Sequence, residues 1–434
     1  MRRAAVLTIS LTLAIPAQAQ VLNYEDVFQS PTLTGTWNGE RTKLEEKGIQ
    51  LGGDEILEAL GNPQGGLQQG GRVEGRFELF ANIDLEKALG WQGALFHANA
   101  YQIHGQGLSS HNLGNLVSVS NIEARPATQL FSLWLQKSLF DDTLSLRAGQ
   151  IAADDEFFVS QYAPLFINST FGWPAIMGIN LPSGGPAYPM ARLGLRARVA
   201  LSPRLTLAAA VFNGDSRADP SGLDVHINGD PFAISELAYS MTMFEMPGSM
   251  KLGAWFHGGR FNDQRFDGAR VSLADPASSG MAGLHRGDDG GYFILDQLLW
   301  RNGGSDAGLG GFFRIGGAPN DRNLVELHMD GGLTLAAPFG RANDTVGIGL
   351  SYEQIGASQK DLARDYRRLT GTSMPAPDFE SALVISYQAQ VASWWIVQPD
   401  VQWIIHPGGR VLDLSNPPAR ENAMVLGLRT AVAL

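Results

Sequence analysis

Three things that this chain lacks narrow its function before any motif is considered. It has no cysteine among its 434 residues, which excludes a disulfide-stapled secreted domain and any site built on thiolate ligands. Acidic residues outnumber basic ones by 43 to 32, so a nucleic-acid partner, which requires a basic surface, is not expected. The longest uncharged stretch after the N-terminus, 157–191, contains five prolines and therefore cannot form a membrane-spanning helix.

Motifs for catalysis are also missing. The sequence contains no HExxH, GxSxG or Walker A pattern, and it implies no cofactor. His97 and His104 are seven residues apart on an expected strand, hence on opposite faces, and cannot chelate one metal ion. An enzyme is therefore the least favoured class of function.

The first 19 residues have the pattern of a secretory signal peptide. Arg2 and Arg3 precede an apolar core at 4–15, and the small residues Ala17 and Ala19 form a cleavage site before Gln20. The chain is therefore expected to be exported. Because the apolar run is too short to cross a bilayer, a membrane helix is the weaker interpretation.

The last stretch, 422–434, shows the pattern on which the fold prediction rests. Large apolar residues occupy one parity, and small or charged residues such as Gly427 and Arg429 occupy most of the other. Successive side chains of a strand point to opposite faces, and a strand of about 9–11 residues that is apolar outside and polar inside is typical of a transmembrane β-barrel. The apolar parity comprises Met424, Leu426, Leu428, Val432 and Leu434.

The same alternation recurs along the chain and predicts an all-β, antiparallel transmembrane barrel of sixteen strands within 49–434. Short connectors mostly alternate with long ones, as periplasmic turns alternate with outer loops in such barrels. The preceding segment, 20–48, is expected in the periplasm with a short helix that Asn38 caps and Gly48 ends. The predicted strands are 49–60, 71–86, 91–104, 127–139, 143–150, 190–201, 205–213, 232–244, 249–260, 290–301, 308–317, 323–337, 343–355, 379–390, 394–406 and 422–434.

Polar residues that share one parity of these strands are expected to line a water-filled lumen, because Arg or Lys on the lipid face costs about 2–4 kcal/mol at the midplane. His257 and His328 are expected in the same wet lumen. The channel-lining candidates on the strands are Arg72, Glu74, Arg76, Glu78, Trp134, Arg147, Arg192, Arg196, Arg198, Glu326, Trp394 and Asp400.

Three blocks of sequence resemble the carbohydrate-selective outer-membrane porins of the OprB family. They are LTGTWNGERTKLEEKGI at 33–49 with LGNPQGG after it, LRAGQIAADDEFF at 146–158 with its continuation to Asp215, and YQAQVASWWIVQPDVQWIIHPGG at 387–409 with the final strand. The resemblance implies a sixteen-stranded porin that admits monosaccharides and related small sugars. The C-terminal residue is Leu434, whereas barrels of this kind usually end in an aromatic residue.

The segment 151–189 is too rich in aromatic residues for a free outer loop. We expect it to fold into the barrel and narrow the pore; the alternative is an outer loop packed on its neighbours or on another subunit. Its acidic head, Asp154, Asp155 and Glu156, would then face the arginines and set up a field across the opening. Alternatively, these charges pair with one another and brace the wall.

Aromatic residues with lumen parity could stack on sugar faces, although Trp and Tyr also form girdles at membrane interfaces. These residues are Tyr101, Trp134, Trp255 and Trp394. The predicted function is passive diffusion of small sugars such as glucose through the outer membrane of a Gram-negative bacterium. The alternatives are a general diffusion porin and, third, an outer-membrane enzyme. Expected partners are sugars in transit, outer-membrane lipid and lipopolysaccharide, the barrel-assembly machinery and a homo-oligomer.

Overall fold

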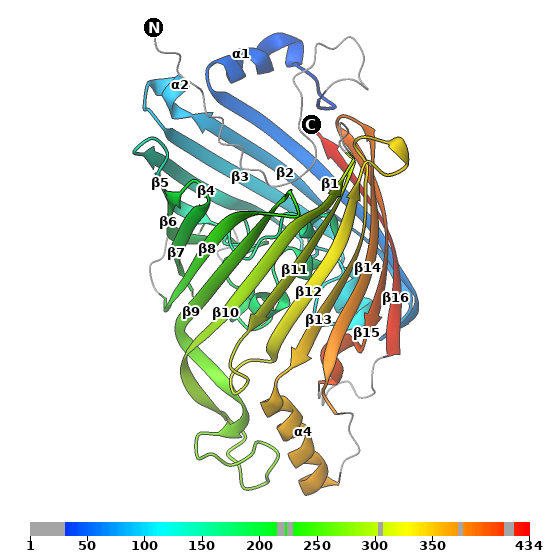
Figure 1. Cartoon of the computed structure of the whole chain (residues 1–434). Helices are drawn as coiled ribbons and strands as arrows, with labels where there is room; N and C mark the ends of the chain where they lie inside the picture. The colour runs from blue at the N-terminus through cyan, green and yellow to red at the C-terminus, as the bar shows by residue number, and fades with distance from the viewer. Residues whose placement is uncertain (1–30, 215–221, 224–228, 303–306, 372–375, 412–420) are drawn as a thin grey trace.

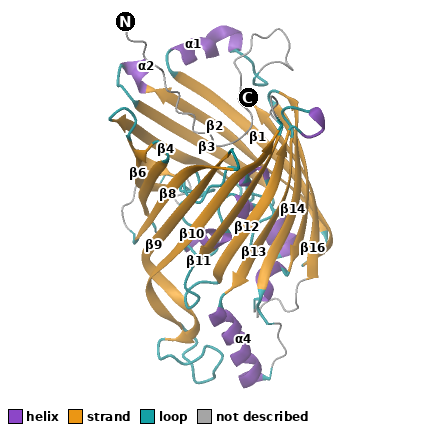
Figure 2. Ribbon diagram, in the orientation of Figure 1, coloured by secondary structure: helices purple, strands orange, loops and turns teal. Residues whose placement is uncertain are grey.

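The computed structural model describes residues 31–214, 222–223, 229–302, 307–371, 376–411 and 421–434. The predicted signal peptide, 1–19, and residues 20–30 lie outside these ranges. Figures 1 and 2 show a barrel whose C-terminus lies at one end, together with the helices α1 (Glu40–Glu46) and α2 (Leu85–Leu89). We call this the short-turn end. The helix α4 (Ala357–Thr370) projects from the opposite, long-loop end.

Sixteen antiparallel strands form one closed sheet, as predicted. Each strand pairs with the next along the chain, and β1 pairs with β16 to close the barrel. The strands are β1 (Ile49–Gly66), β2 (Gly70–Asp84), β3 (Ala94–Gly105), β4 (Ala127–Leu139), β5 (Leu144–Ile151), β6 (Arg192–Ser202), β7 (Leu205–Asn213), β8 (Pro231–Met243), β9 (Met246–Asp267), β10 (Ala282–Arg301), β11 (Gly308–Gly317), β12 (Val325–Ala336), β13 (Thr345–Ile355), β14 (Phe379–Ala392), β15 (Trp395–Ile405) and β16 (Glu421–Ala433).

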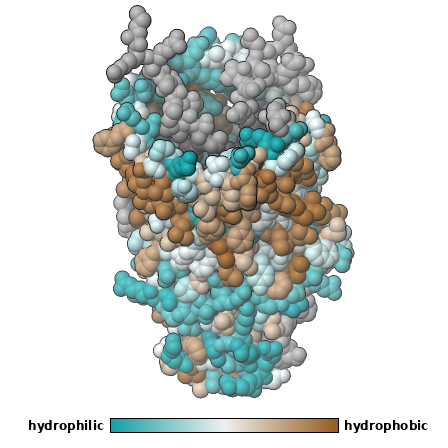
Figure 3. All heavy atoms as spheres, viewed as in Figure 1, coloured by the Kyte–Doolittle hydropathy of each residue, from teal (hydrophilic) through white to brown (hydrophobic). Residues whose placement is uncertain are grey.

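The register places the apolar parity on the outside. Leu195, Leu252 and Leu428 are 58%, 63% and 50% exposed, although they are large and apolar. Figure 3 shows such residues gathered in a belt between two hydrophilic ends. Among the described residues, no helix is both long and apolar enough to cross a bilayer. The barrel wall therefore presents the lipid-facing surface that the alternation predicted.

The N-terminal helix exists, but its predicted cap is wrong. Asn38 has φ of 58° and lies in a 3₁₀ turn, and Gly39, with φ of 90°, precedes α1 without any side-chain cap. An N-cap residue needs an extended backbone, which this turn excludes. The turn instead brings Arg41 over the Trp37 ring, 4.2 Å from its centroid, and lets Arg41 donate to the main-chain oxygen of Leu434 at 2.9 Å.

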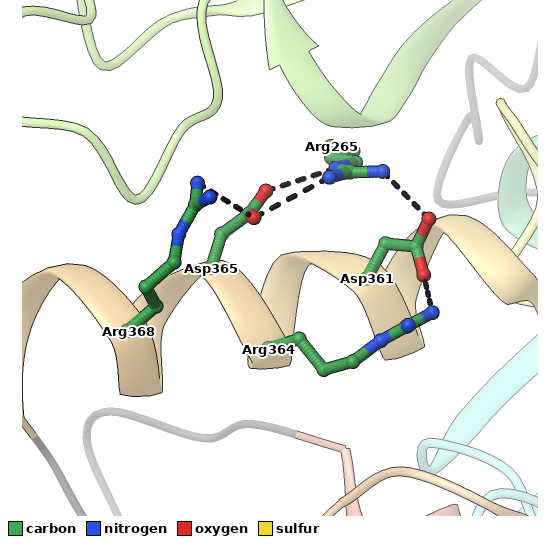
Figure 4. Close-up of a pocket in the computed structure, with 5 residues that line it drawn as sticks. All are labelled: Arg265, Asp361, Arg364, Asp365 and Arg368. Atoms are coloured by element: carbon green, nitrogen blue, oxygen red, sulfur yellow. Dashed lines mark hydrogen bonds and ion pairs between the residues drawn. The ribbon is translucent and has the colours of Figure 1, made fainter.

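The long-loop end contains structure that the sequence did not predict. β9 and β10 run beyond the expected 249–260 and 290–301, and α4 lies within a predicted connector. Arg265 of β9 holds α4 through Asp361 and through Asp365, the latter with N–O distances of 2.9 and 3.3 Å (Figure 4). These residues, with Arg364 and Arg368, line a cavity of about 190 Å³ that is separate from the lumen contacts described below.

Arg41 is expected to stabilise the barrel by tying α1 to the last strand. Arg41→Ala removes the hydrogen bonds to Leu434 and to the Gly35 oxygen, each of the charged kind that contributes roughly 1.5–3 kcal/mol. We expect the temperature at which the folded form is lost on heat-modifiability gels to fall by several degrees. Lys43→Ala is the control, because Lys43 is exposed and, among the described residues, pairs with Glu40 on the same helix. Equal transition temperatures for the two variants would contradict the role of Arg41.

The attachment of α4 to Arg265 through Asp361 and Asp365, which we call the α4 clamp, is expected to depend on pH. Burial opposes the charge of Asp365, but hydrogen bonds from Arg265 and Ser272 hold its pKa below the usual carboxyl value. Because the pKa is lowered in the folded state, the clamp is at full strength above about pH 3.9 and is lost as the pH falls through the lowered pKa. A spin label on Thr370→Cys should therefore become mobile in acid.

Arg265→Gln should release the same label at neutral pH and raise its mobile fraction roughly fivefold, as the loss of about 1 kcal/mol implies. Arg286→Gln, an exposed arginine on the same hairpin, provides the control. A label that stays immobile in the Arg265 variant would show that α4 is held by other contacts.

Candidate functional site

The segment between β5 and β6, residues 152–191, lies inside the barrel, and we call it the long inner loop. Its aromatic residues Phe157, Phe158, Phe166 and Phe171 are each no more than 1% exposed. Phe158 stacks on Tyr292 of β10, with ring centroids 4.0 Å apart. Inside the barrel these aromatic side chains have the apolar surroundings that an exposed outer loop would not provide.

A buried arginine on the barrel wall anchors this loop. Arg314 of β11 donates to the main-chain oxygens of Phe158, Thr170 and Gly172 at 2.9, 2.8 and 3.3 Å. Its guanidinium also forms a fully buried ion pair with Asp330 of β12. A planar guanidinium with five donors can satisfy a carboxylate and several loop carbonyls at once.

Two further contacts hold the loop on neighbouring strands. Thr170 donates to Glu353 at 3.1 Å, and Glu353 also lies 2.9 Å from His328. On β10, Asp296 accepts from the Ser160 hydroxyl at 2.5 Å. His328 is fully buried beneath the loop and His257 is 3% exposed, so the expectation that both face lumen water is wrong: the loops and neighbouring side chains cover them.

A second segment, residues 106–126, also folds into the barrel, and we call it the short inner loop. Glu380 of β14 accepts from the main-chain N–H groups of Leu116 and Val117 at 2.7 and 3.0 Å. Asn121 donates its N–H to the Ile167 oxygen at 2.7 Å and so joins the two inner loops. The sequence predicts only a long connector here. Its apolar residues, such as Leu113 and Val119, were the available signal, and both are completely buried.

The inner loops pack mainly against the wall of β7 to β16, and the charged site lies on β1 to β6. Glu156 in the long inner loop bridges two arginines of this wall, with its Oε1 2.8 Å from both Arg147 and Arg196. Gln136 accepts from the same two arginines at 2.9 Å. The predicted meeting of the acidic head with the arginines is therefore present through Glu156, which forms direct ion pairs with Arg147 and Arg196. We call the three arginines of β6, Arg192, Arg196 and Arg198, the arginine ladder.

The rest of the acidic head is less tightly bound. Asp154 accepts from the Tyr188 N–H at 3.0 Å, and Asp155 lies half-buried beside Asp154 and within the electrostatic reach of Arg147. Arg192 is buried, whereas Arg198 is exposed at the end of the ladder. Arg198 is thus the ladder arginine most accessible to a solute.

A neighbouring part of this wall, on β1 to β3, carries a second charged group. Arg76 of β2 lies 3.2 Å from both Asp54 and Glu78, and its guanidinium stacks over Tyr101 at 4.7 Å. Glu78 also accepts from the Asn99 amide at 2.7 Å. Charged donors and acceptors therefore alternate over a short distance on this face of the lumen.

The lumen aromatics are mostly covered. Trp134 lies between the His97 ring, at 4.8 Å, and the Arg147 guanidinium, at 3.9 Å, and is 8% exposed. Tyr101 is 6% and Trp255 4% exposed. Their faces are therefore occupied by protein groups, and polar side chains are the more accessible surface of the site.

The remaining predicted site residues lie in other places. Glu74 and Asp400 have lumen parity but are buried, and Arg72 lies near the long-loop end of β2. Glu326 accepts from the Ala357 N–H at 3.0 Å at the start of α4, and Trp394 stacks on Trp395 in the turn before β15. Among the described residues, no group of three or more His, Asp or Glu side chains could hold a metal ion.

Comparisons with known proteins agree with this architecture. The family model described as "Carbohydrate-selective porin, OprB family" matches residues 68–434. Porin B of Pseudomonas aeruginosa is 25% identical over 431 residues, covering 92% of this chain and 90% of that protein. The high-pH structure of OprB from Pseudomonas putida superposes with a TM-score of 0.82 at 23% identity, covering 94% of this chain and 99% of that one.

The bridge made by Glu156 is expected to set both the charge and the rigidity of the site. Glu156→Gln leaves Arg147 and Arg196 without their carboxylate, a change that costs roughly 3–5 kcal/mol when the pair is fully buried. We expect a shift of the reversal potential toward anion preference in planar bilayers and a noisier open channel. Glu326→Gln, at the rim, serves as the control. An unchanged reversal potential in the folded Glu156 variant would show that this carboxylate does not face the ion path.

Proposed function

The chain belongs to the carbohydrate-selective porin, OprB family, and from this premise we propose that it carries small sugars such as glucose by passive diffusion. It is an outer-membrane β-barrel porin and not an enzyme. The observation that supports sugar passage best is the close alternation of Arg198, Asp155, Arg76 and Glu78 on one side of the lumen. Sugar hydroxyls both donate and accept, so they match such a surface without a net charge of their own.

We assign the constriction to the long inner loop. It crosses the lumen from the β5–β6 wall to contacts on β10, β11 and β13, through Ser160, Phe158 and Thr170. Buried ion pairs and stacked rings hold it there, which supports a narrow opening of constant width. A narrow and polar opening favours small hydroxylated solutes over large or apolar ones.

A general diffusion porin without sugar preference is the second candidate. The ion pairs of Arg76 and of Glu156 would also suit other small polar solutes, including amino acids. Swelling of liposomes that contain the protein, measured with a graded series of neutral sugars and amino acids of matched size, distinguishes the two. Faster entry of sugars than of amino acids supports sugar selectivity, and entry that follows size alone supports the general porin.

The cellular context follows from the same proposal. We infer that residues 1–19 are removed as a signal peptide after export, and that 20–48 form a periplasmic segment. The short-turn end, with α1, α2 and the C-terminus, then faces the periplasm, and α4 faces the exterior. Lipid and lipopolysaccharide would surround the apolar belt, and the barrel-assembly machinery would insert the chain.

Arg198 is expected to act on solutes directly, whereas Arg192 and Arg196 are buried in the wall. Arg198→Gln keeps the length and the hydrogen-bonding capacity but removes a charge, so the reversal potential should shift toward cations and glucose entry should fall several-fold. Arg204→Gln, an exposed arginine in the turn before β7, is the matched control. If neither quantity changes in the Arg198 variant, the ladder braces the wall and does not select solutes.

A further inference from the structure

A row of uncharged polar side chains crosses the lumen face of the wall near the short-turn end. Gln50 of β1 lies directly opposite Asn82 of β2, and Asn82 lies directly opposite His97 of β3. Directly paired residues share a face, and Asn82 has the same parity on β2 as Arg76 and Glu78, which face the lumen. The short-turn ends of β1 and β2 lie beside α1 and α2 (Figure 1). The row therefore lies between Arg76 and the short-turn mouth of the channel.

Hydrogen bonds within the row determine which of its groups remain available to a solute. Asn82 donates its amide N–H to the Gln50 Oε1 atom at 3.1 Å, so its own Oδ1 atom faces the His97 Nδ1 atom at 2.6 Å. A carbonyl oxygen cannot donate, so Nδ1 carries the proton and Nε2 of the neutral imidazole presents a lone pair. Among the described residues, neither His97 Nε2 nor Gln50 Nε2 has a hydrogen-bonding partner. The row thus offers one free acceptor beside free amide donors.

The ring of Phe80 lies beside this row. Phe80 is two residues from Asn82 on the same face of β2, and it is directly opposite Gly52 of β1. A Cβ at position 52 would collide with the tip of the Phe80 ring, so the ring extends over the space that Gly52 leaves. Phe80 is half-buried, and within the described part of the chain no other ring and no cation stacks on it. Unlike Trp134 and Tyr101, it therefore has an aromatic face that a solute can contact.

We propose that Phe80, Gln50, Asn82 and His97 form a subsite for one ring of a neutral sugar, close to the short-turn mouth. This rests on the proposed passage of sugars and adds where a sugar is held and by which groups. The apolar face of the sugar ring lies on Phe80, in the way that ligand sites combine aromatic surface with a few placed polar groups. Two residues along a strand span roughly 7 Å, so hydroxyls of the same ring reach the row. Because the row carries no charged side chain, a neutral hexose loses less hydration there than a sugar acid or an amino sugar.

Binding of glucose to the full-length channel in planar bilayers tests the subsite. Bound glucose obstructs the ion path, so its dissociation constant follows from the fall in single-channel conductance as glucose is added. Phe80→Leu keeps an apolar side chain but removes the ring face, and should raise this dissociation constant about fivefold. The reversal potential should not change, because no charge is altered. Phe77→Leu is the matched control and should bind glucose as the unmutated channel does, since Phe77 lies on the lipid-facing side of the same strand.

Gly52→Ala tests the same surface without replacing an aromatic residue. The added methyl group displaces the Phe80 ring, so glucose affinity should fall by a similar factor. Gly61→Ala, on the same strand and with no atom closer than 3.4 Å to the new Cβ, is its control. His97→Phe keeps a ring against Trp134 but removes both nitrogens, and should weaken glucose binding several-fold. Heat-modifiable migration on gels verifies that each variant is folded.

The outcomes separate the subsite from the proposed function. If the unmutated channel prefers sugars in liposome swelling, but glucose affinity is unchanged in folded Phe80→Leu and Gly52→Ala, the subsite is wrong and sugar passage stands. The same holds if the channel prefers sugars but glucose never reduces its conductance. If it shows neither sugar preference nor glucose binding, both proposals are wrong. An equal loss of affinity in Phe77→Leu or Gly61→Ala would also overturn the subsite, because a general disturbance of the wall would then explain the effect.

Discussion

The barrel must close, because hydrocarbon offers no water to an unpaired N–H or C=O group. The pairing of β1 with β16 meets this requirement between segments at opposite ends of the described chain. On the lumen side an ion pair between Glu58 and Arg429 joins these two strands, and at the short-turn end the Leu434 N–H donates to the Gly53 oxygen at 2.9 Å. Closure then leaves an interior that the lipid cannot reach.

A barrel of sixteen strands is too wide for wall side chains alone to fill. The two inner loops fill much of that space. Polar side chains on the inward face of the strands therefore also hold these loops in place. Arg314 and Glu380 do not meet channel water but bind the main chain of the inner loops. Alternating polar residues therefore both line the lumen and position the inner loops inside it.

Much of the fold could be predicted, because alternation with a period of two is a local property. It located all sixteen strands and separated Leu428 from Arg429 correctly. It could not predict α4, whose buried residues face a hairpin a hundred residues away in the chain, as the Arg265–Asp365 contact shows. The predicted cap at Asn38 failed for a similar reason, since the turn around it brings Arg41 to the far end of the chain.

The sequence by itself determined which side chains point inward. It also determined that the aromatic segment after β5 had to be shielded from water. It did not determine which inward charges meet water. That depends on contacts between residues far apart in the chain, such as Arg314 with Thr170 and Glu380 with Val117. The face of the sheet on which a side chain lies is determined by adjacent peptide units. Its exposure to the channel is determined by the path of the two inner loops through the lumen. Only the tertiary structure could therefore separate Arg198, which is exposed, from Glu74 and Asp400, which are buried.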